Sequence, residues 1–126
     1  MLEVSRVELL EVSVAEPVEV DISGGIEVGP FHYEVEVGKE ASQELRGRER
    51  YGEICYQNQK IRLGNTWGQE RLNETFMHEV VEAVNNEYSN SSLKHEEIVC
   101  LGNGLAQVMK SLGVVFMFGV KVRGRG

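Results

Sequence analysis

The chain has 126 residues with a hydrophobic content of 41%, enough for one compact core and too little for two comfortable domains. Its formal net charge of −7 argues against nucleic acid as a partner, because proteins that wrap nucleic acid neutralise phosphates with lysine and arginine. No run of about 20 apolar residues could span a bilayer, and no secretory signal is visible. We therefore expect a cytoplasmic protein with no membrane or nucleic-acid partner.

The first third of the chain predicts β-structure. The stretch "VSVAEPVEVDI" alternates apolar and polar side chains, as in a strand with one buried face, and Pro17 interrupts it as in an edge strand or a bend. The turn sequence "SGG" suggests a division into an N-terminal β extension, residues 1–23, and a compact domain, residues 24–126. The next strand, "IEVGPFHYEVEVG", places His32 on its polar face, where we expect it to be solvated.

The middle of the chain predicts a connecting segment and a hairpin. Residues 38–50 are polar and charged without a clear periodicity, which is typical of a loop or a short helix. The stretch "YGEICYQNQKIRLG" predicts a β-hairpin with "QNQ" at the turn. Ile54 and Tyr56 lie on one arm, and Ile61 and Leu63 lie on the other.

The second half of the chain predicts two helices. The first runs from about Trp67 to Tyr88 with Thr66 as its N-terminal cap. The second follows "SNSS", with Ser92 as its cap, and ends at Gly113. Apolar residues at helical spacing form a stripe that we expect to be buried on the first helix, and a further stripe on the second: Leu72, Phe76, Val80, Ala83 and Val84, then Ile98, Leu101, Leu105, Val108 and Leu112.

The order of these elements predicts an α+β fold class. A small antiparallel sheet comes first, and two helices joined by a tight turn follow it as an antiparallel pair. The closing stretch "VVFMFGVKV" is a last strand or a packed tail, because periodicity does not separate the two for so short an apolar run.

Three polar residues of the first helix suggest a metal site with a catalytic carboxylate. Because residues four apart on a helix lie on the same face, His78 and Glu82 can direct an imidazole nitrogen and a carboxylate oxygen at one point. Glu79 is rotated by roughly 100° from His78, so it reaches a metal-bound water instead of the metal. A carboxylate in that place takes the proton of a water whose pKa a zinc ion has lowered.

A third protein ligand must come from elsewhere in the chain. The turn between the helices folds the second helix back along the first, which brings His95 toward His78. His95 shares a stripe with Gly102 and Ala106, small residues that allow two helices to approach closely. His95 is therefore the preferred third ligand. The alternatives at this helix start are Glu96 and Glu97.

The same residues also fit the solvated face of an ordinary amphipathic helix. Glu74, His78 and Glu82 lie together on the flank opposite the apolar stripe, and carboxylates are abundant in this chain. The spacing of the residues alone leaves both interpretations open.

Four stretches carry a resemblance through their order and spacing: "IEVGPFHYEV", "YGEICYQNQKIRL", "QERLNETFMHEVVEAVNN" and "LKHEEIVCLGNGLAQVMKSLG". With them, the chain from about Ile26 to Leu112 resembles small phage and prophage-encoded zinc peptidase-like proteins, related to the ImmA/IrrE-like and minimal gluzincin group. In that group a hairpin precedes a metal-binding helix. A second helix with a "LANGLYQVL"-like segment, here "LGNGLAQVM", supplies the last ligand.

The motif of this chain departs from the usual HExxH of the group. It reads HExxE, and a histidine stands at about the place of the group's later glutamate. The resemblance thus implies a minimal zincin-like fold in which an exchanged set of His78, Glu82 and His95 holds a zinc ion, with Glu79 as the base. It implies a phage-type zinc metallopeptidase that hydrolyses peptide bonds. The alternative is a non-catalytic protein-interaction module on the same fold, with structural zinc or no metal.

The resemblance also bears on the substrate. It implies that the strand ending near Ile61 to Leu63 borders the cleft and pairs with an extended peptide through its backbone groups. A tyrosine hydroxyl at the cleft would assist an oxyanion. The candidates are Tyr51 and Tyr56.

Overall fold

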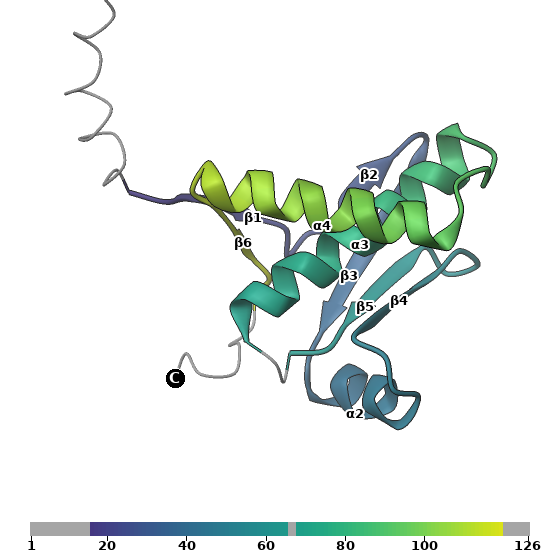
Figure 1. Cartoon of the computed structure of the whole chain (residues 1–126). Helices are drawn as coiled ribbons and strands as arrows, with labels where there is room; N and C mark the ends of the chain where they lie inside the picture. The colour runs from purple at the N-terminus through teal and green to yellow at the C-terminus, as the bar shows by residue number, and fades with distance from the viewer. Residues whose placement is uncertain (1–15, 66–67, 120–126) are drawn as a thin grey trace, which may run out of the picture.

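The computed structural model describes residues 16–65 and 68–119, which form two small sheets and three helices (Figure 1). In chain order the elements are β1 (Val18–Asp21), β2 (Ile26–Val28), β3 (Phe31–Val37), α2 (Lys39–Gly47), β4 (Gly52–Cys55), β5 (Lys60–Leu63), α3 (Gln69–Tyr88), α4 (His95–Ser111) and β6 (Val114–Met117).

The expected α+β class is confirmed, but the larger sheet is mixed rather than antiparallel throughout. Its strand order is β2–β3–β5–β4. The β2–β3 and β4–β5 pairs are antiparallel, whereas β3 and β5 run parallel, with Val35 opposite Ile61. This pairing is parallel because α2 and β4 lie between β3 and β5 in the sequence. They return the chain to the end of the sheet where β3 begins, so β5 runs in the same direction as β3. A second sheet pairs β1 with β6, also in parallel, with Val18 opposite Val114.

The predicted hairpin is confirmed as β4 and β5, except that Tyr56 lies in its turn and not on an arm. Two open assignments are also decided. The polar stretch after β3 contains helix α2, which buries Ala41 and Leu45 completely. Ser42 ties this helix to the segment after β5, because its Oγ donates to Oδ1 of Asn65 at 2.7 Å and accepts the N–H of Asn65 at 2.9 Å. The closing segment contains strand β6, whose Phe116 is buried.

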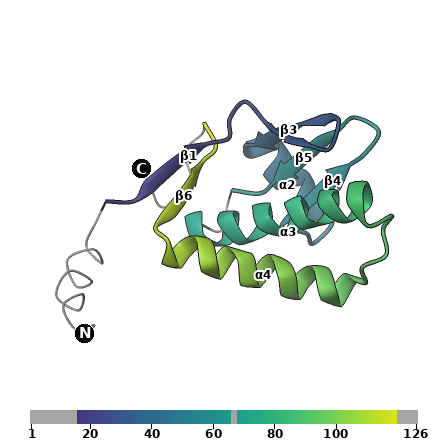
Figure 2. The same cartoon turned by 90° about the horizontal axis from the view of Figure 1, so that it is seen from above.

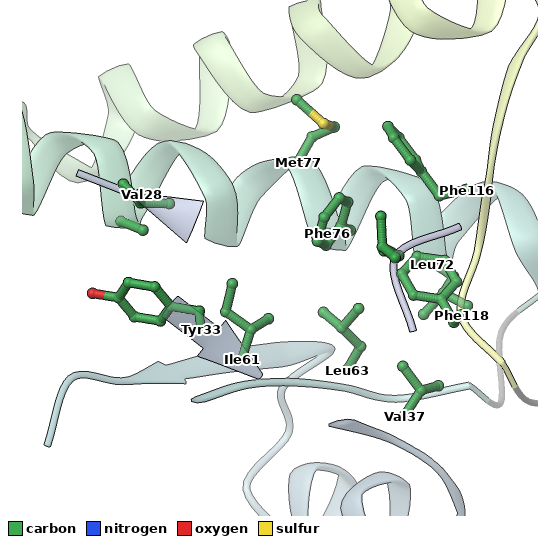
Figure 3. Close-up of a cluster of buried hydrophobic side chains, with 12 residues drawn as sticks. Val28, Tyr33, Val37, Ile61, Leu63, Leu72, Phe76, Met77, Phe116 and Phe118 are labelled. Carbon is green, nitrogen blue, oxygen red and sulfur yellow. The ribbon is translucent and has the colours of Figure 1, made fainter. Parts of the chain in front are cut away.

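α3 lies across the larger sheet, and the hydrophobic core fills the space between them (Figure 3). In Figure 3, Leu72 and Phe76 project from the helix toward the sheet that carries Ile61 and Leu63. The ring of Phe76 packs edge-on against Phe116 and Phe118, with ring centroids 5.1 and 5.6 Å apart. The core therefore joins α3 both to the larger sheet and to the segment after α4 that carries Phe116 and Phe118.

The start of α3 and one residue of its stripe differ from the prediction. The helix begins at Gln69, preceded by Gly68 with a φ of 98° and no side-chain cap. The expected cap, Thr66, and the expected first residue, Trp67, lie outside the described residues. Val84 was expected to be buried but is 40% exposed. It lies about 100° round the helix from the buried Ala83, on a flank that the sheet does not cover.

α4 differs from its prediction in both its start and its apolar stripe. It begins at His95, where the N–H of Lys94 donates to the carboxylate of Glu97 at 2.8 Å, so Ser92 is not its cap. Ile98 is buried, but the other members of the stripe are 39 to 65% exposed. The reason is that, among the described elements, α4 packs mainly against α3 and β6 and buries a narrow face. The exposed members are Leu101, Leu105, Val108 and Leu112.

The predicted N-terminal extension is described only from residue 16 onward; residues 1–15 lie outside the described part of the chain. Val18 and Val20 of β1 are 54 and 38% exposed, whereas Ile22 is 5% exposed and joins the core. The N–H of Ile22 also donates to the carbonyl of Met117 at 2.9 Å. The expected buried face is thus present at Ile22 and absent in β1 itself, which has β6 as its one partner among the described strands.

Candidate metal site

α4 lies alongside α3 on the side away from the sheet (Figure 2). A buried asparagine positions the turn between the two helices. Asn85 is only 5% exposed. Its Oδ1 accepts the N–H of Leu93 at 3.1 Å, and its carbonyl accepts the N–H groups of Ser89 and Ser91, each at 3.0 Å. These bonds hold both ends of the turn to one residue of α3, so α4 begins at a defined place with His95 as its first residue.

Close approach of the two helices brings the two histidines together. A Cβ on Gly102 would lie 3.0 Å from the Cα of His78, which is tighter than ordinary packing, so any larger residue would push α3 and α4 apart at this point. The rings of His78 and His95 are consequently near each other, with centroids 5.9 Å apart. The small residue predicted to permit this packing is confirmed in that role at Gly102.

Gly102→Ala tests this contact. We expect a loss of stability of about 1–2 kcal/mol, because overpacking costs more than the gain of about 1 kcal/mol in helix propensity. We expect the affinity of the candidate site for zinc to fall as well, because α4 must move away from His78. The matched control is Gly104→Ala, whose added methyl group meets no atom within 4 Å and which should stabilise the helix. Urea unfolding and zinc titration of both variants measure the two effects, and equal behaviour of the variants would contradict the packing argument.

Three predicted ligands meet at one point between the helices. His78, Glu82 and His95 each offer a donor atom, and these atoms all lie within 4.8 Å of one another. Nε2 of His78 lies 3.8 Å from Oε2 of Glu82. A tetrahedral zinc ion holds its donors about 3.3–3.5 Å apart, so small side-chain rotations would close the set. Two imidazoles and one carboxylate are a donor set that suits zinc.

The alternative ligands at the start of α4 do not join this group. Glu97 is engaged in capping its own helix through the N–H of Lys94. Within the part of the chain that the structure describes, Glu96 is not a member of the cluster. The third histidine, His32, does not belong to the cluster. It lies on β3, where its ring is 3.3 Å from the carboxylate of Glu27.

Glu79 is a buried carboxyl group beside the cluster. Its exposed fraction is 5%, and among the described residues it has no hydrogen-bond or ion-pair partner. Burial raises the pKa of Glu79 to about 8, and the nearby carboxylates of Glu82 and Glu53 add to the shift, while Arg50 opposes it. Burial of a carboxyl group without an ion-pair partner lowers the stability of a fold, and such groups are typical of functional sites.

The cluster and Glu79 line a cleft of about 820 Å³ between the helix pair and β4. The cleft was expected beside the strand that ends near Ile61 to Leu63, and this is wrong. That strand, β5, pairs with β3 on one side and β4 on the other, so β4 is the edge strand at the cleft. The lining residues from the hairpin side are Glu49, Arg50, Tyr51, Gly52, Glu53, Ile54 and Tyr56.

Two tyrosines border the cleft, and their surroundings differ. The hydroxyl of Tyr56 donates to the carbonyl of Glu82 at 3.3 Å, and burial, with the charge of Glu82, raises its pKa to about 12. Tyr56 therefore stays protonated as a donor near the cluster. The ring of Tyr51 is covered instead by the guanidinium group of Arg71, 4.5 Å from its centroid. Sequence reasoning missed Glu53, because its position on the edge strand depended on which strand of the hairpin faces α3.

Comparison with known proteins identifies no family for this chain. No protein-family model matches the chain, and neither a curated protein nor a solved structure is significantly similar to it. The resemblance to zinc peptidase-like proteins therefore stays a prediction from sequence motifs. Within residues 16–65 and 68–119, no helix is long and apolar enough to cross a membrane.

Proposed function

We propose that this protein is a metal-dependent hydrolase of the zinc metallopeptidase type. The observation that supports the proposal best is the meeting of His78, Glu82 and His95 in a cleft, directly beside the carboxyl group of Glu79, which is buried and has no ion-pair partner among the described residues. A solvated helix face would explain exposed carboxylates. It does not explain why the Glu79 carboxyl group is buried, without an ion-pair partner among the described residues, next to two neighbouring imidazole rings.

The residues divide into two roles. His78, Glu82 and His95 would hold the metal, which lowers the pKa of a bound water and polarises a carbonyl group when it is present. Glu79 accepts a proton from the attacking water and passes it to the leaving amine. Its low exposure keeps the carboxylate poorly solvated and therefore a stronger base than a surface glutamate. The hydroxyl of Tyr56 supports the site as a hydrogen-bond donor on the hairpin side of the cleft.

The substrate class follows from the edge strand. β4 pairs with β5 on one side, and among the described residues no strand pairs with its other side, which borders the cleft. A free strand edge supplies a row of backbone donors and acceptors, which is how extended peptides are bound by strand addition. A peptide or a flexible protein segment is therefore the proposed substrate.

The proposal is tested by digestion of a peptide mixture with the zinc-loaded protein. We expect cleavage that Glu79→Gln reduces by about 10³-fold or more without loss of zinc, because general-base assistance contributes on this scale. Glu87→Gln, on the same helix and outside the cleft, is the matched control and should cleave normally. Activity retained in Glu79→Gln would remove Glu79 from the mechanism. Bound zinc without cleavage of any peptide would favour the alternative, a non-catalytic protein-interaction module.

A further inference from the structure

α4 presents an exposed apolar stripe that the proposed metal site does not use. Leu101, Leu105, Val108 and Leu112 are 47, 39, 49 and 65% exposed. They follow one another at spacings of four, three and four residues, the pattern of helices that pair with other helices. Single exposed apolar residues are ordinary, but a continuous row of them marks an interaction surface.

The stripe lies on the side of α4 away from the cleft. Residues two apart on a helix are about 160° apart around its axis, which separates Leu105 from Asn103, a residue of the cleft wall. None of the four stripe residues lines the metal cleft or the smaller cavity of about 340 Å³ between α3, α4 and β6. A substrate in the cleft therefore leaves the stripe uncovered.

We propose that the stripe is the contact surface for a second copy of this chain, with the two α4 helices packed antiparallel about a twofold axis. A twofold axis through the middle of the stripe places Leu101 opposite Leu112 of the partner subunit and Leu105 opposite Val108 of the partner subunit. Every apolar side chain then meets another apolar side chain. One short stripe thus supplies both halves of a self-complementary interface.

The charge distribution agrees with this pairing. The chain has a net charge of −7, yet residues 98–109 contain no charged side chain. Cys100, Gly104 and Ser111 flank the stripe on its outward side and are small enough for close helix contact. Lys110 forms an ion pair with Glu70 of α3. The centres of protein interfaces are depleted of charged residues, and the stripe shares this composition.

The area of the stripe predicts a weak dimer. Four partly exposed side chains offer on the order of 400 Å² per copy, about half the area that each partner buries in a standard interface. The dimer is therefore in equilibrium with monomer and does not form an obligate assembly. Since the stripe and the cleft lie on opposite flanks of α4, both copies keep an open cleft.

Sedimentation equilibrium over a wide range of protein concentration tests the proposal. We expect the average mass to rise from monomer toward dimer, and Leu105→Glu to lower the association constant by about tenfold or more, because two carboxylates would be buried at the twofold axis. Val108→Glu is a second variant with the same expected effect. Tyr88→Ser, at a 68% exposed aromatic residue outside the stripe, is the matched control and should dimerise normally. Circular dichroism verifies that each variant folds.

Three results would overturn the proposal. In the first, the full chain stays monomeric at every concentration. In the second, the dimer persists in both glutamate variants, which would place the contact on another surface. In the third, the full chain is monomeric and dimerises only after removal of residues 1–15, which would show that this segment of the same chain covers the stripe.

Discussion

Replacement of either histidine of the cluster by alanine is expected to abolish stoichiometric zinc binding. The wild-type protein should bind about one zinc ion per chain, and His78→Ala or His95→Ala should weaken binding by several orders of magnitude, because a three-ligand site cannot hold the ion with two donors. The two histidines come from different helices, so loss of zinc in both variants would show that the α3–α4 contact assembles the site. Elemental analysis after dialysis, together with competitive zinc titration, measures the effect.

The chain offers a matched control for this experiment. His32→Ala removes the remaining histidine, which lies on β3 beside Glu27, and it should leave zinc content unchanged. Glu96→Gln removes the neighbouring carboxylate that the sequence offered as an alternative third ligand and that the structure leaves out of the cluster. Equal zinc content in wild type and the His78 and His95 variants, or zinc lost from Glu96→Gln alone, would contradict the proposed ligand set.

The metal-free protein is expected to lose stability as the pH rises from about 5 to about 8, and Glu79→Gln is expected to remove that loss. In the unfolded chain, Glu79 ionises near its ordinary pKa of 4.5, whereas burial, with the charges of Glu82 and Glu53, raises its pKa to about 8 in the folded protein. Between these values the folded state keeps a proton that the unfolded state has released. The free energy of unfolding therefore decreases with pH in this window, by an amount on the order of a few kcal/mol.

Urea unfolding in the presence of a chelator, at pH 5 and pH 9, measures this difference. At pH 5 the wild type and Glu79→Gln should have similar stability, since both carry an uncharged side chain at this position. At pH 9 the variant should be the more stable of the two. Glu96→Gln, which replaces an exposed carboxylate at the start of α4, should follow the wild type. If the free energy of unfolding depends on pH in the same way for the wild type and Glu79→Gln, burial does not raise the pKa of Glu79.

Local patterns predicted the elements that have a strong period or turn signal. The alternation around Ile54 and Ile61 predicted the hairpin, and the helical spacing of Leu72 and Phe76 predicted α3 and its buried face. The spacing of His78 and Glu82 placed two donors on one face, because the geometry of a helix is set by its own backbone bonds. These inferences needed no information about distant parts of the chain.

Contacts between distant segments decided the rest. The parallel pairing of β3 with β5 and the place of β4 at the cleft depend on how strands choose partners, which side-chain alternation within one strand does not encode. Periodicity likewise placed Leu105 in an apolar stripe but did not predict that its side chain is exposed, because burial depends on what packs against α4. The same limit applied to Val18 of β1, whose neighbour is a single strand.

The candidate site shows both kinds of information. The sequence by itself determined an HExxE helix face and offered a later histidine, through side-chain chemistry and a fixed helical period. Only the tertiary structure decided that His95 meets His78, because Asn85 holds the turn and Gly102 lets the helices approach. It also decided that Glu79 is buried where α3 packs against β4, whereas the spacing of residues in the sequence left both a solvated helix face and a metal site open.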